Sequence, residues 1–186
     1  MGARISAGVL KGLPLIVSSR IRPTKAKVRQ ALFSIVGSAI GEARVVDAFA
    51  GSGALGLEAL SRGAGFVAFI ESDTESVLNI RDNLTRVASD ISRKAWRVLH
   101  MEVERGLPAL ASSEAPFDVI ILDPPYRTND AKKALNTVVG CAMLAPAGLV
   151  IIEHDQRTEL PVSVGPLQQC KRHRYGDTVL SFYQAP

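Results

Sequence analysis

The pattern of hydrophobic and polar positions changes along the 186-residue chain in a regular way. From residue 43 onward, short apolar runs typical of buried strands alternate with segments whose apolar residues recur every three or four positions. The apolar runs predict strands at 43–49, 66–73, 95–101, 118–123 and 148–154. The segments between them predict helices at 57–63, 74–87, 103–111 and 132–143.

Strands that alternate with helices at this spacing predict an α/β fold, because parallel neighbours are joined by helical crossovers. Residues 169–183 add two antiparallel strands around Gly176 and Asp177. We therefore expect a doubly wound, mostly parallel, seven-stranded Rossmann-like sheet with helices on both faces. Such sheets bind ligands at the carboxyl ends of their strands, near the point where the strand order reverses.

The first forty residues have a different pattern and a concentrated positive charge. Arg4 to Leu15 predicts short strands or turns, and Thr24 is a candidate N-cap for a helix that ends at Gly37. Residues 1–46 carry eight Lys and Arg against one Glu, a net charge of +7, whereas the rest carries 14 bases and 17 acids, a net −3. This positive charge indicates either that residues 1–46 bind a polyanion or that they form a solvated basic face without a partner. We predict one domain over 1–186, with a basic extension at 1–40 and a core at 44–186.

Several classes of protein are disfavoured by composition. No segment approaches the roughly 18 uninterrupted apolar residues of a membrane helix, and no apolar leader follows the first charges. Cys141 and Cys170 lie far apart without metal or redox spacing, which favours two buried thiols in a reducing cytoplasm. We find no Cys, His and Asp cluster for a metal, so we expect no metal and no membrane.

The first candidate site is the glycine-rich stretch VVDAFAGSGALGLEAL. Gly51 and Gly53 permit a tight turn after the first strand, and Gly56 lets the next helix approach the sheet. Such a turn could hold a pyrophosphate or only serve packing. Asp47 favours a different ligand, because a carboxylate repels a pyrophosphate but accepts hydrogen bonds from an ammonium group. This argues for a cofactor that carries an amino acid, of which S-adenosylmethionine is the common example.

The second and third strands end in further acceptors. Glu71 lies about twenty residues beyond the glycine turn, where an acid can bind ribose hydroxyls. Met101 suits either an adenine face or the core, and Glu102 could accept a hydrogen bond from the adenine amine.

The fourth strand runs into the stretch DVIILDPPY, which ends in Asp123, Pro124, Pro125 and Tyr126. The prolines stiffen the backbone and have no amide hydrogen, so nearby carbonyls can point into a site. An Asp carboxylate beside a free carbonyl suits an exocyclic NH2 group with its two donors. Tyr126 offers a flat surface on which a base can stack. The stretch predicts a clamp for the amino group of a nucleobase, although a strand-ending turn with ordinary packing is the alternative.

The segments DAFAGSGALGLEAL, FIESD and ILDPPY together resemble the class I S-adenosylmethionine-dependent methyltransferases that act on exocyclic amino nitrogens. RISAGVLKGLPL followed by RPTKAKVRQALFSIV is similar to the bacterial family that methylates the N2 of a guanine in small-subunit (16S) ribosomal RNA. Lys27, Gln30 and Glu102 depart from the usual residues of that family. The likeness spans nearly the whole chain and implies a monomer that acts on ribosomal RNA in an assembled or nearly assembled small subunit.

The residue types and the resemblance together give three sets of candidate residues. Those expected at the reaction centre are Asp123, Pro124, Pro125 and Tyr126. Those expected to bind S-adenosylmethionine are Thr24, Asp47, Phe49, Gly51, Ser52, Gly53, Glu71, Ser72, Met101 and Glu102. Those expected to hold RNA phosphates are Arg4, Lys11, Arg20, Arg22, Lys25 and Arg29.

Three other functions compete with this one. An adenine-N6 DNA methyltransferase shares the clamp, but little of this chain remains for a target-recognition segment. A protein glutamine methyltransferase usually has Asn where this chain has Asp123. A catalytically idle RNA-binding module would not need an intact set of Asp47, Gly51, Gly53, Glu71 and Asp123.

Overall fold

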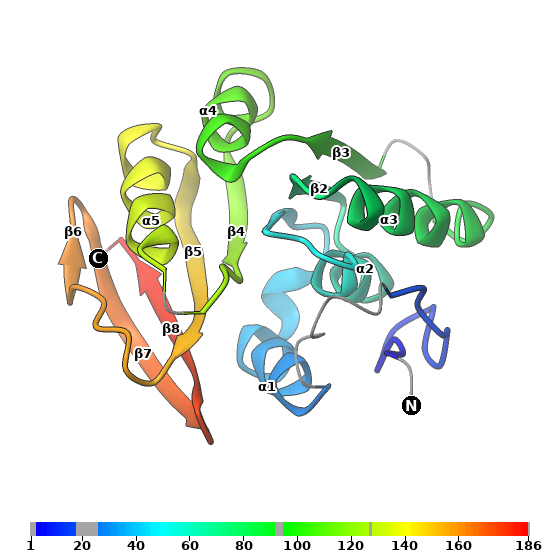
Figure 1. Ribbon diagram of the computed structural model, residues 1–186, viewed down its shortest axis with the longest axis horizontal. Helices are drawn as coiled ribbons and strands as arrows, with labels where there is room; N and C mark the ends of the chain where they lie inside the picture. Colours follow the sequence, from blue (N-terminus) through cyan, green and yellow to red (C-terminus); the bar gives the residue numbers. More distant parts are fainter. Residues whose placement is uncertain (1–2, 18–25, 92–94, 127, 186) are drawn as a thin grey trace.

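The computed structural model describes residues 3–17, 26–91, 95–126 and 128–185. An eight-stranded sheet crosses these residues in the order β3-β2-β1-β4-β5-β8-β7-β6 (Figure 1). Neighbours among β1 to β5 are parallel, whereas β6, β7 and β8 pair antiparallel. The strands are β1 Arg44–Ala48, β2 Phe66–Glu71, β3 Trp96–His100, β4 Phe117–Leu122, β5 Leu144–Asp155, β6 Ser163–Val164, β7 Leu167–Tyr175 and β8 Thr178–Gln184.

Helices cover both faces of the sheet, as the alternation predicts. One hydrophobic cluster joins α1, α2 and α3 to the sheet, and a second joins α4 and α5 to its other face. Strand residues alternate between the clusters: Val45 belongs to the first and Val46 to the second. The helices are α1 Ala26–Val36, the short 3-10 helix η1 Gly37–Ile40, α2 Ala54–Ser61, α3 Thr74–Arg86, α4 Val103–Ser113 and α5 Asp130–Gly140.

The expected number of seven strands is wrong. The additional strand, β6, has two residues and shows no readable alternation, so pairing with β7 alone defines it. Strand β5 also begins at Leu144, earlier than expected, because it continues past a register irregularity opposite Phe117 and Val119. Helix α5 accordingly ends at Gly140, and Ala142 beyond it has a φ of 49°.

The segment 3–17 forms turns and one antiparallel bridge between Arg4 and Pro14, as expected for this stretch. Its apolar residues Ile5 and Leu10 are buried in the first cluster. Gly8 has a φ of 82°, and a Cβ there would lie 1.7 Å from the Ser61 carbonyl oxygen. The segment can therefore dock closely on α2 only because this position is glycine. The expected N-cap Thr24 lies outside the described residues.

The cysteines and the lengths of the helices bear on two expectations from composition. Cys141 is half-buried and Cys170 is exposed, so the expected pair of buried thiols is wrong. In the ranges that the structure describes, every helix is too short or too polar to cross a bilayer.

Candidate functional site

The two acids that end β1 and β4 meet where the strand order of the sheet reverses. Strands β1 and β4 are parallel neighbours, with β2 and β3 on one side and β5 on the other. Asp47 pairs in register with Ile121, and the Asp123 amide donates to the Ala48 carbonyl at 3.3 Å. The fold therefore brings Asp47 and Asp123 to the edge at which such sheets bind ligands.

Asp47 is a buried carboxylate that is only half satisfied. Its side chain is 1% exposed, and its Oδ2 accepts a hydrogen bond of 2.7 Å from the Gly56 amide. Its Oδ1 has no hydrogen-bond partner among the described residues. Burial raises the pKa of Asp47 well above 3.8, the Gly56 amide opposes this, and the charges of Asp123 and Glu71 add to it. A buried acceptor of this kind fits a cationic hydrogen-bond donor.

The turn after β1 has an unusual backbone. Phe49, Gly51 and Gly53 have φ values of 62°, 55° and 74°, in a region that non-glycine residues rarely adopt. A Cβ on Gly56 would lie 2.2 Å from Cε1 of Phe69, so this position must be glycine for α2 to approach the sheet. The expected roles of these glycines in the turn and in packing are confirmed.

Glu71 is fixed beside this turn by backbone amides. Its Oε2 accepts from Gly51 at 2.7 Å, and its Oε1 accepts from Ser72 and Asp73, each at 2.8 Å. A carboxylate has about four acceptor sites, so these bonds leave room for one further donor. Ser52, in the same turn, is buried at 4% exposure, and its carbonyl accepts from Asn83.

Met101 and Glu102 follow β3 at the same edge of the sheet. The Met101 amide donates to the Glu71 carbonyl at 2.9 Å, which ties the ends of β2 and β3 together. Met101 is half-buried and packs against the second hydrophobic cluster. Glu102 is exposed at the start of α4, and its carboxylate forms no capping hydrogen bond.

Beyond β4, the two proline carbonyls differ in their hydrogen bonding. Pro124 is buried and Pro125 is exposed. The Pro125 carbonyl accepts from Thr128 Oγ1 at 2.9 Å. In the part of the chain that the structure describes, no donor reaches the Pro124 carbonyl. Asp123 and this carbonyl are two neighbouring acceptors, as the clamp requires.

Tyr126 is held by the neighbouring strands through its hydroxyl group. The hydroxyl donates to Oε1 of Glu153 in β5 at 3.0 Å and lies 2.9 Å from Oγ1 of Thr178 in β8. Burial, with the charge of Glu153, raises the pKa of Tyr126 to about 12, although Thr178 opposes the shift. The residue remains 39% exposed. Its ring is thus oriented and still accessible to a ligand.

A family model described as "Conserved hypothetical protein 95" matches residues 3–184. The chain belongs to this family. A Bacillus subtilis protein named "Putative rRNA methyltransferase YlbH" is 35% identical over 183 residues, which cover 97% of this chain and 98% of that protein. The Escherichia coli "Ribosomal RNA small subunit methyltransferase D" is 32% identical over 160 residues, which cover 85% and 77%.

A solved structure agrees with this assignment. The "Putative methyltransferase yhhF from Escherichia coli" superposes with a TM-score of 0.85 and 29% identity, and covers 98% of this chain and 97% of that one. The resemblance expected from the sequence is confirmed at the level of the family, and the α/β fold is that of these methyltransferases.

The basic residues expected at an RNA surface differ from one another in their exposure. Arg4 and Lys11 are exposed on the N-terminal segment. Arg29 is 1% exposed, and its guanidinium donates to the Arg4 carbonyl and pairs with Glu58. A buried and paired guanidinium cannot reach a phosphate, so the expectation for Arg29 is wrong. Thr24, Arg20, Arg22 and Lys25 lie outside the described residues.

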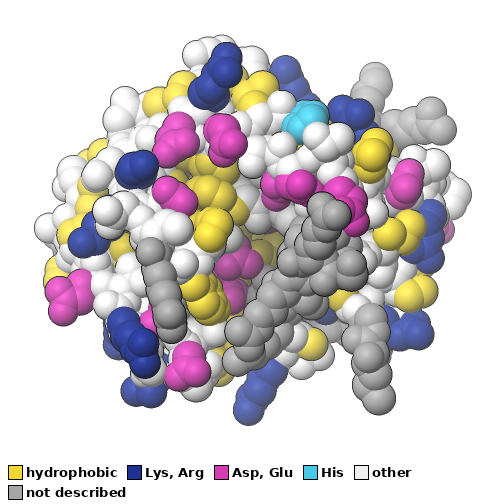
Figure 2. All heavy atoms as spheres, viewed as in Figure 1, with side chains coloured by type: hydrophobic (Ala, Val, Ile, Leu, Met, Phe, Trp, Pro, Cys, Tyr) yellow, Lys and Arg dark blue, Asp and Glu magenta, His cyan; other side chains and the backbone are white. Residues whose placement is uncertain are grey.

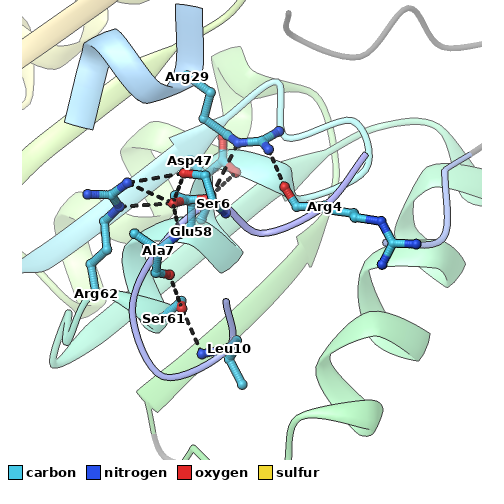
Figure 3. A network of polar contacts seen from close by, with 10 residues as sticks. Arg4, Ser6, Ala7, Leu10, Arg29, Asp47, Glu58, Ser61 and Arg62 are labelled. Atoms are coloured by element: carbon cyan, nitrogen blue, oxygen red, sulfur yellow. Dashed lines mark hydrogen bonds and ion pairs between the residues drawn. The ribbon is translucent and has the colours of Figure 1, made fainter. Parts of the chain in front are cut away.

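Glu58 in α2 is a central residue that the sequence pattern did not reveal. It is fully buried, and Figure 3 shows it among side chains from α1, α2 and the N-terminal segment. Its carboxylate accepts from the Ser6 amide at 2.8 Å, from the Ser6 hydroxyl at 2.5 Å and from Arg62 Nε at 2.9 Å. This network fastens the basic extension to the core.

Asn83 in α3 makes a second such connection and was also missed. It is fully buried; its Oδ1 accepts from the Ile16 amide, and its Nδ2 donates to the Ile16 carbonyl, both at 2.9 Å. Its weaker contact with Ser52, at 3.5 Å, links the extension to the glycine turn. Glu58 lies in the glycine-rich stretch but was assigned no role there, and Asn83 belongs to no motif, so only the tertiary contacts reveal their roles.

The surface around the site is hollowed. Figure 2 shows acidic side chains inside a depression near the centre of this face. A separate cavity of about 450 Å³ lies at the opposite edge of the sheet, where Ala43 and Asp118 mark the starts of β1 and β4. That cavity is remote from the carboxyl ends of the strands and is not the candidate site. The described residues include no group of three or more His, Cys, Asp or Glu arranged for a metal ion.

Proposed function

We propose that the protein transfers a methyl group from S-adenosylmethionine to the exocyclic N2 of a guanine in small-subunit ribosomal RNA. The observation that carries this proposal is the pair of acceptors, Asp123 and the Pro124 carbonyl, placed beside Asp47 where the strand order reverses. The names of the relatives support ribosomal RNA as the substrate. We further propose a monomer that acts on an assembled or nearly assembled small subunit.

The residues at the carboxyl edge fit S-adenosylmethionine. The buried Oδ1 of Asp47 suits its ammonium group, because no described residue donates to this oxygen. The positive-φ turn at Gly51 and Gly53 lets the ligand approach the backbone, and Glu71 retains acceptor capacity for a ribose hydroxyl. Phe49, Ser52, Ser72, Met101, Glu102 and, outside the described residues, Thr24 complete the proposed cofactor site. When bound, the cofactor supplies an electrophilic methyl group on its sulfonium sulfur.

Asp123 and the Pro124 carbonyl would orient and activate the guanine amine. Its nitrogen is a poor nucleophile, because its lone pair is delocalised into the ring. Acceptors on both N–H groups favour a tetrahedral nitrogen with its lone pair directed out of the ring plane. They also stabilise the positive charge that develops on this nitrogen during transfer. Asp123 need not be a strong base, since the methylated amine becomes acidic and can lose its proton to water.

Tyr126 would stack on the target base while Glu153 and Thr178 hold its hydroxyl. The base must enter unpaired, because an amine inside a helix is blocked by pairing and stacking. Arg4 and Lys11 on the surface, with Arg20, Arg22 and Lys25 outside the described residues, would hold neighbouring phosphates. Arg29 is not part of this proposal.

The test is methyl transfer from labelled S-adenosylmethionine to small ribosomal subunits that lack the native modification, followed by nucleoside analysis. Wild type is expected to form N2-methylguanosine. Asp123→Ala is expected to reduce the rate at least about a hundredfold while it still binds the cofactor. The matched control is Asp82→Ala, which removes an exposed acid of α3 and should leave the rate unchanged.

If the labelled methyl group were found on adenine instead of guanine, the result would favour an adenine-N6 methyltransferase with the same clamp. Cofactor binding without transfer to any RNA would overturn the proposed substrate. Neither cofactor binding nor transfer, in a protein that is folded and binds small subunits, would favour an idle RNA-binding module.

A further inference from the structure

We propose that the outer strand β7 forms a second RNA-binding surface, which holds phosphates of small-subunit ribosomal RNA beside the base-binding site. We call this surface the basic edge; it consists of Arg172 and Arg174, which lie two residues apart and therefore on one face of β7, whereas Lys171 and His173 lie on the other face. The inference rests on the proposed function, because it assigns a further contact with the same RNA. It is distinct from the basic extension at the N-terminus.

The basic edge is exposed and its cations are unpaired. Arg172 and Arg174 are exposed, as are Lys171 and His173 on the other face, and β6 pairs with β7 only at Leu167 and Gln168. Among the described residues, no carboxylate lies within 4.0 Å of Lys171, Arg172 or Arg174 in an ion pair. By contrast, Arg44 and Arg97 both pair with Glu114. The cations of the basic edge are therefore available to an anion from outside the protein.

The charge of the basic edge differs from that of its surroundings. Residues 47–186 carry 14 bases and 17 acids, yet this strand places three cations within four residues. The nearest acid along the chain is Asp177 in the following turn, whose Oδ1 accepts from Gln156 Nε2 at 3.0 Å. A local excess on a net-negative body fits a polyanion.

The basic edge lies next to the site of the target base. Tyr126, which would stack on that base, contacts Thr178, the first residue of β8. Thr178 pairs with Tyr175, the last residue of β7, so β7 ends at the edge of the sheet that carries Asp123. Arg174 Nε donates to the Gly176 carbonyl at 2.8 Å, which holds its guanidinium at this turn. From Arg174 the basic edge extends roughly 7 Å back to Arg172, at about 3.3 Å per residue.

Charged residues also protect an edge strand from pairing with another chain, and this role competes with RNA binding. The two roles differ in what they predict. Edge protection predicts self-association when the charges are removed, with no change in RNA affinity. Phosphate binding predicts weaker affinity in a protein that remains a monomer.

The test measures co-sedimentation of the full chain with small ribosomal subunits over a range of salt concentrations, and methyl transfer to the same particles. The variants are Arg172→Gln/Arg174→Gln, the charge-preserving Arg172→Lys/Arg174→Lys, and the control Arg81→Gln/Arg97→Gln. The control removes two exposed cations from the region of β3, at the other end of the sheet. Light scattering monitors the association state of each protein.

The Gln variant is expected to bind small subunits roughly tenfold more weakly and to raise the KM for the particle similarly, with kcat within about twofold. The slope of log affinity against log salt should become shallower by about 1.4, since each lost contact with a single strand removes about 0.7. The Lys variant should retain most of the affinity, and the control should match wild type.

Equal affinity and equal salt slope for the Gln variant and wild type would overturn the proposal that the basic edge binds RNA. Self-association of the Gln variant with unchanged affinity would assign the charges to edge protection instead. An inactive wild type would refute the proposed function. Because co-sedimentation requires no methyl transfer, the binding comparison would still show whether the basic edge contacts RNA.

Discussion

Arg29 of α1 and Glu58 of α2 form a buried ion pair, with Arg29 Nε 3.4 Å from Glu58 Oε2 and both side chains no more than 2% exposed. Burial lowers the pKa of Arg29, and the charge of Glu58 opposes that shift. The pair joins the basic extension to the core, because Glu58 also accepts from Ser6 and Arg29 donates to the Arg4 carbonyl. One of the cations counted in the basic extension is therefore structural.

Glu58→Ala is expected to lower the free energy of unfolding by about 3–5 kcal/mol, because it leaves Arg29 buried without its charge partner. Urea denaturation would measure this. Glu159→Ala, which removes an exposed acid, is the control and should change stability by less than about 0.5 kcal/mol. A loss below about 1 kcal/mol for Glu58→Ala would show that the network does not hold the extension.

Gly56→Ala is expected to destabilise the protein by about 1–3 kcal/mol, because the added Cβ would lie 2.2 Å from Phe69 and 2.9 Å from Val67 Cγ1. Gly140→Ala in α5 is a matched control, since a Cβ there meets no atom within 4 Å. That change should be neutral or stabilising, because alanine favours helices over glycine. Equal thermal midpoints for the two variants would contradict the close approach of α2 to the sheet.

Asp47→Asn is expected to stabilise the cofactor-free protein at neutral pH. Because burial raises the pKa of Asp47 well above 3.8, the folded state holds a proton that the unfolded chain releases, so stability falls as pH rises from about 3.8 through the raised pKa. Asparagine removes this dependence. Urea denaturation between about pH 4 and pH 8 would test it. Parallel pH profiles for the two proteins would contradict the shift.

The same variant should bind S-adenosylmethionine more weakly, because an amide is a poorer acceptor for an ammonium group than a carboxylate. Isothermal titration would measure this. If Asp47→Asn gains stability but binds the cofactor as tightly as wild type, Asp47 is a buried carboxylate that does not bind the ammonium group.

Glu153→Gln is expected to lower the pKa of Tyr126 from about 12 toward its ordinary value of 10.0, because it removes a negative charge that disfavours the phenolate. The shift should be partial, since burial is the largest cause. Ultraviolet titration of the phenolate, taken as a difference from Tyr126→Phe, isolates this residue from Tyr175 and Tyr183. An unchanged pKa would show that Glu153 does not hold the hydroxyl.

Glu153 would then act as a positioning residue for the Tyr126 ring. The variant is expected to raise the KM for small subunits severalfold more than it lowers kcat, because a loosened ring binds the base less well. Tyr126→Ala should show a larger effect than Tyr126→Phe, which keeps the stacking surface. Equal effects of the two Tyr126 variants would argue against stacking.

The sequence by itself determined the alternating order of strands and helices and the edge of the sheet to which the candidate site residues are brought. Apolar runs in β1, β2 and β4 end in Asp47, Glu71 and Asp123, and parallel strands carry their carboxyl ends to one edge. Gly51 and Gly53 were predictable for a similar reason, because a tight turn after β1 requires positive φ. These features depend on local periodicity and on the geometry of parallel strands.

Only the tertiary structure decided which charged residues are buried and which partners they meet. Arg29 and Glu58 lie 29 positions apart, and Tyr126 meets Glu153 and Thr178 at separations of 27 and 52. Strand β6 is defined by its pairing with β7 alone. The sequence does not distinguish a solvated charged side chain from one that is paired in the core, because the residues that surround it are brought together only by folding.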